Sequence, residues 1–81
     1  MAPEPLKKLQ QEIEKTQASN DEQAASMADL RDHIQRAIDE PENAPGLLEA
    51  LRDSFAQFQA DHPQLAAAIQ SAVDFLAESG V

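Results

Sequence analysis

Pro41-Glu42-Asn43-Ala44-Pro45-Gly46 separates the two halves of this chain and contains two of its five prolines and one of its two glycines. Proline disfavours helical dihedral angles in the residue before it, so we expect the preceding helix to end at Glu40. The 81 residues include no cysteine, tryptophan or tyrosine, and alanine, leucine, glutamine and glutamate are frequent. That composition is typical of helices, and no stretch alternates apolar and polar residues like a strand. We therefore predict an all-α protein in which residues 1–81 form a single helical domain.

Two helices are predicted before this stretch. The spacing of Leu6, Leu9 and Ile13 predicts a helix from about Pro5 to Gln17. Ser19-Asn20-Asp21-Glu22 is typical of a helix start, in which Ser19 caps the first turn and Glu22 reaches back to it. The apolar face of the second helix is then Met27, Leu30, Ile34 and Ala37 or Ile38.

Two further helices are predicted after it. The apolar face of the third consists of Leu47, Leu48, Leu51, Phe55 and Phe58. Asp61-His62-Pro63 interrupts the pattern, and the fourth helix follows with Leu65, Ile69, Ala72, Val73 and Leu76 facing inward. Gly80 is placed to end it in a Schellman motif, with an apolar contact between Leu76 and Val81.

Two architectures satisfy this periodicity. The first is a small up-and-down bundle of three or four short helices, with loops at about 18–21, 41–46 and 61–63. The second is a long helical hairpin, in which Thr16, Asn20 and Gln23 are polar seam residues and Pro63 kinks the second helix. Three consecutive polar seam positions beside a capping sequence favour a break near Ser19, and therefore the bundle.

The last third of the chain contains a specific pattern: Phe58-Gln59-Ala60-Asp61-His62-Pro63-Gln64-Leu65, then Ile69, Val73, Leu76-Ala77 and Gly80-Val81. This pattern resembles the DUF4404 family of small bacterial helical proteins of unknown function. The resemblance covers roughly residues 55–81. It implies a bacterial origin and a small helical fold, and it implies no activity, cofactor or catalytic residue.

The charge is strongly acidic and unevenly distributed. Fifteen acidic residues against six basic ones give a formal net charge of −9, yet three lysines balance three glutamates in residues 1–20. The net negative charge argues against nucleic acid or an anionic membrane as a partner. It either permits a basic partner protein or merely keeps a small protein soluble. No apolar run approaches the roughly 20 residues needed to span a bilayer. With no cysteine either, we expect a cytoplasmic protein.

Several residues are candidates for a site. Asp39, Glu40 and Glu42 flank Pro41, and Glu49 and Asp53 follow, so these five acids form either a patch for a basic partner or a solvated surface. Asp29 and His33, four residues apart, form either half of a metal site or a solvated pair. A metal site needs more ligands than this pair supplies, and we predict no metal or cofactor.

His62 has two interpretations. It is either a pH-responsive or ligand-binding imidazole, or a cap residue that bonds to the exposed amides of the fourth helix or lies against Phe58. In the second interpretation Pro63 occupies the first helical position.

No catalytic motif is present, so we predict that the chain is not an enzyme. Phe75 is either core or exposed for a partner, and fifteen alanines leave a thin core that a second chain could complete. The leading hypothesis is a protein–protein interaction module or homodimer. The alternative is a small-ligand or pH-responsive sensor centred on His62.

Overall fold

The computed structural model describes residues 4–79, and these form four α-helices without any strand. The helices are α1 (Glu4–Lys15), α2 (Asp21–Asp39), α3 (Ala44–Phe58) and α4 (Pro63–Glu78), with a short 3-10 helix, η1 (Pro41–Asn43), between α2 and α3. The predicted all-α bundle is therefore confirmed. The Schellman motif predicted at Gly80 and Val81 lies outside the described residues.

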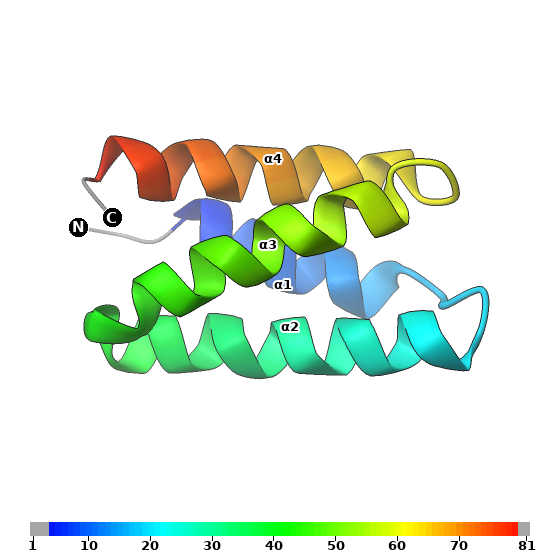
Figure 1. Ribbon diagram of the computed structural model, residues 1–81, viewed down its shortest axis with the longest axis horizontal. Coiled ribbons are helices and arrows are strands. Elements are labelled where there is room, and N and C mark those ends of the chain that lie inside the picture. The colour runs from blue at the N-terminus through cyan, green and yellow to red at the C-terminus, as the bar shows by residue number, and fades with distance from the viewer. Residues whose placement is uncertain (1–3, 80–81) are drawn as a thin grey trace.

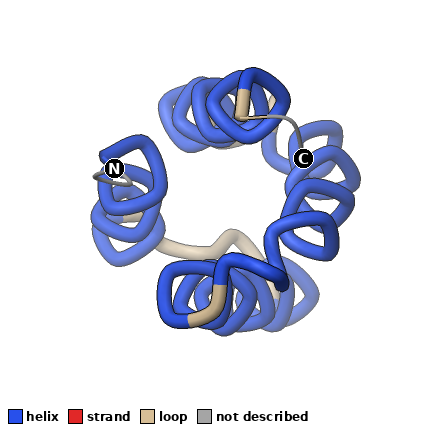
Figure 2. Tube along the Cα trace, turned by 90° about the vertical axis from the view of Figure 1, so that its left-hand side faces the viewer, coloured by secondary structure: helices blue, strands red, loops and turns tan. Residues whose placement is uncertain are grey.

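The four helices form an up-and-down bundle with α1 and α4 side by side (Figure 1). Viewed end-on, they occupy the corners of a square (Figure 2). Each helix packs against its two neighbours around this square, and within residues 4–79 the backbones of diagonal helices do not approach each other closely. The bundle measures 33 × 19 × 18 Å, so its four long sides form most of its surface.

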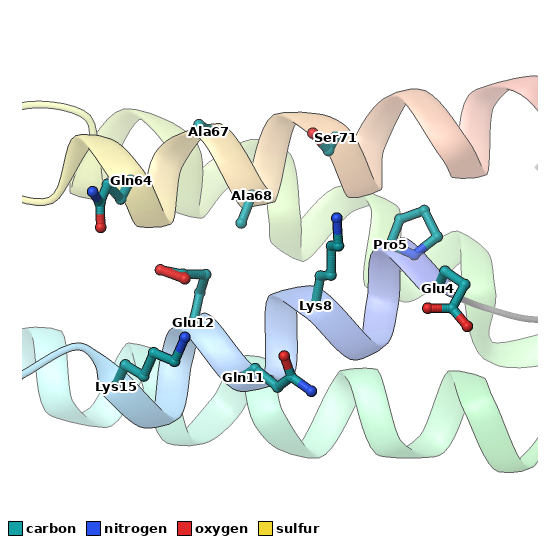
Figure 3. A pocket seen from close by; sticks show the side chains of 10 residues that line it. All are labelled: Glu4, Pro5, Lys8, Gln11, Glu12, Lys15, Gln64, Ala67, Ala68 and Ser71. Carbon is teal, nitrogen blue, oxygen red and sulfur yellow. The ribbon is translucent and has the colours of Figure 1, made fainter.

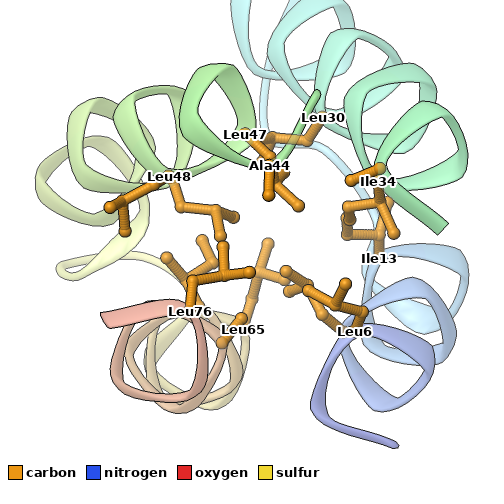
Figure 4. Close-up of a cluster of buried hydrophobic side chains, with 14 of the residues drawn as sticks. Leu6, Ile13, Leu30, Ile34, Ala44, Leu47, Leu48, Leu65 and Leu76 are labelled. Carbon is orange, nitrogen blue, oxygen red and sulfur yellow. The ribbon is translucent and has the colours of Figure 1, made fainter. Parts of the chain in front are cut away.

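The core fills the space between the helices, and every helix contributes apolar side chains to it (Figure 4). The predicted inward residues of α1 and α2 are buried, Ala37 being chosen over the half-buried Ile38. Phe55 and Val73, predicted to face inward, pack against the core but are only half-buried. Ser54 and Ala66, which were not predicted, are buried. Small side chains fit where neighbouring helices approach closely, while the larger ones lie at the edge of the stripe. The buried Ser54 hydroxyl donates to the carbonyl of Ala50 at 2.8 Å, which satisfies it.

The start of α2 is capped one residue later than predicted. Asn20, in an extended conformation, accepts a hydrogen bond from the Gln23 amide at 2.8 Å. Gln23 in turn accepts from the Ser19 amide through its side-chain oxygen at 2.9 Å. Asn20 and Gln23 thus replace the predicted pair of Ser19 and Glu22, because both serine and asparagine are good caps and the packing of Gln23 selects between them.

The stretch 41–46 is more ordered than a loop. Pro41 begins η1 and Glu40 before it is extended, at φ −135° and ψ 95°, as proline requires. However, α3 already begins at Ala44, so Pro45 and Gly46 lie in its first turn. Proline is compatible with a first turn because the amide it lacks would have no helical partner there. The predicted connection at about 41–46 is therefore present, and α3 begins within it.

Pro63 begins α4 rather than kinking a longer helix. Helix α3 ends at Phe58, and His62 is the N-terminal cap residue of α4, at φ −134° and ψ 72°. Helices α1 and α2 are likewise separate, with α1 ending at Lys15 instead of the predicted Gln17. The bundle is thus confirmed, and the alternative of a kinked hairpin was wrong.

Candidate functional site

His62 lies at the end of the bundle where the α1–α2 and α3–α4 connections come together (Figure 1). Its Nε2 atom is 3.2 Å from the side-chain oxygen of Gln23 and 3.2 Å from the hydroxyl of Ser19. Gln23 is only 5% exposed, and its side-chain nitrogen donates to Asp61 at 3.2 Å. These four residues, which we call the loop clasp, join two connections that are about half the chain apart in sequence.

The hydrogen bonds of Gln23 require a proton on the Nε2 atom of His62. The Gln23 oxygen already accepts from the Ser19 amide, and the Gln23 nitrogen donates to Asp61, which defines the orientation of the amide. An amide oxygen only accepts, so Nε2 of His62 must carry the proton that it donates to Gln23. The ring also packs on Phe58, with centroids 6.2 Å apart and planes inclined by 52°.

These contacts favour a structural role for His62. The predicted placement at the cap and against Phe58 is found, but the ring makes no capping hydrogen bond to the amides of α4. Its side chain turns instead to the other connection, and Nε2 is engaged there. A sensor role for His62 stays a prediction.

Two of the five predicted acids line a common groove. Glu49 and Asp53 of α3 line a groove of about 400 Å³ with Asp29 and His33 of α2, which we call the acidic groove. The other three, Asp39, Glu40 and Glu42, are exposed where α2 meets η1 and do not line this groove.

The Asp29–His33 pair is intrahelical and partly exposed. Nδ1 of His33 lies 2.9 Å from the carbonyl of Asp29 and 3.4 Å from its carboxylate. The two side chains are 32% and 66% exposed, His33 being the more buried. Within residues 4–79, no three histidine, aspartate or glutamate side chains gather closely enough to hold a metal ion. The pair therefore belongs to the wall of the acidic groove.

A larger groove, of about 670 Å³, lies between α1 and α4 and was not predicted from the sequence (Figure 3). We call it the α1–α4 groove. Six residues of α1, four of them charged, line one side: Glu4, Pro5, Lys8, Gln11, Glu12 and Lys15. Four residues of α4, three of them small, line the other: Gln64, Ala67, Ala68 and Ser71. Two features of the sequence could have predicted this groove: the lysines are confined to the first helix, and the last helix has small residues on its outer side.

Within residues 4–79, the charged side chains of this groove form no ion pair. Among the described residues, such contacts within 4 Å occur only on α2: Asp32 pairs with Arg36, and Asp29 contacts His33, which is an ion pair only when the histidine is protonated. Glu4, Lys8 and Lys15 are exposed, and Glu12 is half-buried. These four α1 charges therefore have no oppositely charged partner within 4 Å in the described part of the chain.

Comparison with known proteins gives one match. A family model described as a domain of unknown function, DUF4404, matches residues 3–81. The chain belongs to the DUF4404 family. The match confirms the resemblance noted in the last third and extends it over nearly the whole chain. No curated protein and no solved structure matches this DUF4404 chain.

The remaining predicted residues lie apart from both grooves or at their edges. Phe75 of the DUF4404 chain is half-buried and packs against the core, so it is neither fully core nor free. Pro63 is exposed in the first turn of α4. None of the helices in residues 4–79 is long and apolar enough to cross a membrane.

Proposed function

We propose that this DUF4404 protein is a non-enzymatic protein-interaction module whose acidic groove binds a basic segment of a partner protein. The observation that carries the proposal is that carboxylates from two helices, Asp29 of α2 with Glu49 and Asp53 of α3, line one groove. No lysine or arginine is among the residues that line it. Complementary charge of this kind steers a partner and fixes its orientation.

The shape of the groove suits a long basic side chain. Ala50 and the exposed Gly46 line it, and a Cβ atom added at Gly46 would meet nothing within 4 Å. Lysine and arginine bury their aliphatic stems on such small residues while their charged heads reach polar groups at the rim. The three carboxylates would receive those heads.

The overall charge of the chain also favours a positively charged partner. Residues 21–81 contain twelve acidic residues and three arginines, so the negative field surrounds the acidic groove. One of those arginines, Arg36, is paired with Asp32 at 2.9 Å. A basic partner would therefore be attracted from a distance and held at the groove, and salt would weaken both effects.

The test is an NMR titration of the labelled protein with an octalysine peptide, alongside affinity capture from a bacterial lysate. We expect the largest shift changes at the acidic groove, and several-fold weaker binding by Glu49→Gln/Asp53→Asn. Glu14→Gln/Glu78→Gln removes the same charge from outside this groove and is the control. Equal weakening by both variants, or shift changes spread evenly over all acidic surfaces, would overturn the proposal. The same variants used as bait identify a lysate partner that depends on the groove.

A further inference from the structure

We propose that the α1–α4 groove is the contact face of a homodimer, and that a second copy of this chain occupies it, related by a two-fold axis. This surface is separate from the acidic groove between α2 and α3. The inference rests on the charge balance of α1, on the order of its charges along the helix, and on the small residues of α4.

The first argument is net charge. Residues 21–81 carry the entire formal charge of −9, whereas residues 1–20 contain three lysines and three glutamates. Two copies that approach through a surface rich in acids are repelled by like charges. The α1–α4 groove has two lysines and two glutamates among its lining residues. This balanced surface can meet its own copy without that repulsion.

The second argument is the order of the charges. Glu4 and Lys15 are the first and last residues of α1, and Lys8 and Glu12 lie on either side of its middle. All four line the same groove, because their spacing places them on one face of the helix. A two-fold axis across the middle of α1 makes the two copies of this helix antiparallel.

In that arrangement Glu4 faces Lys15 of the second copy, and Lys8 faces Glu12 of the second copy. Symmetry repeats each contact, so every one of these charges meets its opposite. The pattern is thus self-complementary, and within residues 4–79 of one chain none of these side chains is already in an ion pair.

The third argument is space. Ala67, Ala68 and Ser71 of α4 line the groove opposite the middle of α1, where the axis would pass (Figure 3). Small side chains allow helices of two copies to approach closely, since interaxial distance depends on the side chains at the contact. Pro5 and Ala68, both half-buried, add apolar surface to the same face.

The available area is sufficient for a dimer of standard size. Such an interface buries about 800 Å² on each partner, which is roughly a sixth of this chain's 4938 Å² of accessible surface. One long side of a four-sided bundle supplies that much. Exposed ion pairs add little affinity each, so we expect a reversible dimer that depends on concentration and salt.

The test is sedimentation equilibrium from about 10 μM to about 1 mM, the range suited to a weak interface, at low and raised salt. We expect the wild type to dimerise, and Lys8→Glu/Lys15→Glu and Glu4→Lys/Glu12→Lys each to dimerise at least about tenfold less. Glu4→Lys/Glu12→Lys is informative because it reduces the net negative charge. It would therefore dimerise better than the wild type if general charge repulsion determined the affinity. Mixing the two variants should restore a heterodimer, since one then presents only glutamates and the other only lysines at the four positions.

The matched control is Lys7→Glu/Arg52→Glu, which has the same net charge as Lys8→Glu/Lys15→Glu but alters exposed residues outside the groove. We expect it to dimerise like the wild type, apart from a small general effect of charge. A wild type that is monomeric throughout, a control that loses as much association as the groove variant, or a mixture that stays monomeric would each overturn the proposal.

A second measurement covers the case in which charge reversal unfolds α1. The chain has no cysteine, so Ala67→Cys introduces a single reactive thiol in the groove. We expect a short bismaleimide to cross-link it to its own copy, whereas Ala56→Cys, exposed on α3, should remain monomeric. Absence of the cross-link, or equal cross-linking at both positions, contradicts the proposed face. Neither result bears on the acidic groove, so the two proposals stand or fall separately.

Discussion

Replacing Gln23 by methionine tests the loop clasp most directly. Methionine keeps the unbranched length and the helix propensity of glutamine but has no amide. Gln23 makes three side-chain hydrogen bonds, to the Ser19 amide at 2.9 Å and to His62 and Asp61 at 3.2 Å each. All three are lost in the variant, while the capping bond from the Gln23 amide to Asn20 is kept.

The loss of stability expected for Gln23→Met depends on how exposed the three hydrogen-bond partners of Gln23 are. Ser19 and Asp61 are exposed and regain water, so each of their bonds should contribute about 0.5 kcal/mol. His62 is half-buried, so its bond should contribute about 1 kcal/mol. The buried thioether recovers about 0.5 kcal/mol of apolar transfer. We therefore expect the free energy of unfolding to fall by about 1.5 kcal/mol, which lowers Tm by roughly 6–12 °C in a domain of this size.

Urea and thermal unfolding followed by circular dichroism measure this loss. Gln57→Met is the control, because Gln57 is half-buried on α3 and makes no side-chain hydrogen bond within residues 4–79. It should change stability by less than about 0.5 kcal/mol. A loss below that value for Gln23→Met would refute the clasp. So would strictly additive effects of Gln23→Met and His62→Ala, because residues that share a hydrogen bond should show a coupling energy of at least about 0.5 kcal/mol.

Three further substitutions test the fold by the same unfolding measurements. Asn20→Ala should cost about 1 kcal/mol and Ser19→Ala less than half of that, since Asn20 is the cap of α2; the reverse order would contradict the assignment. Phe58→Ala should cost about 3–5 kcal/mol because the ring is fully buried, and a loss under about 2 kcal/mol would contradict its central position. Pro63→Ala should destabilise by about 0.5–1 kcal/mol, since proline is preorganised for the first turn of α4; a gain in stability would indicate a strained kink instead.

The helices and most of the core follow from the sequence. Leu6, Leu9 and Ile13 repeat with the period of a helix, and this spacing alone places them on one face. Proline acts just as locally, so the end of α2 before Pro41 could be predicted without knowledge of the partners of either helix.

Only the tertiary structure decided where polar residues meet. The sequence placed Gln23 in a helix seam only for the hairpin alternative, yet in the bundle it is buried, and Asp61 and His62, 38 and 39 positions away, bind its side chain. The same packing places Asp29 in one groove with Glu49 and Asp53.

The α1–α4 groove shows the same division most clearly. The sequence determines the order of the charges along α1. The charged face lies across a groove from Ala67 and Ala68 because the bundle closes by packing its first helix against its last. Helical periodicity depends on neighbours three and four residues away, and the sequence therefore determines it. Contacts between distant helices depend on how all four apolar faces fit together in one core, which no local pattern determines.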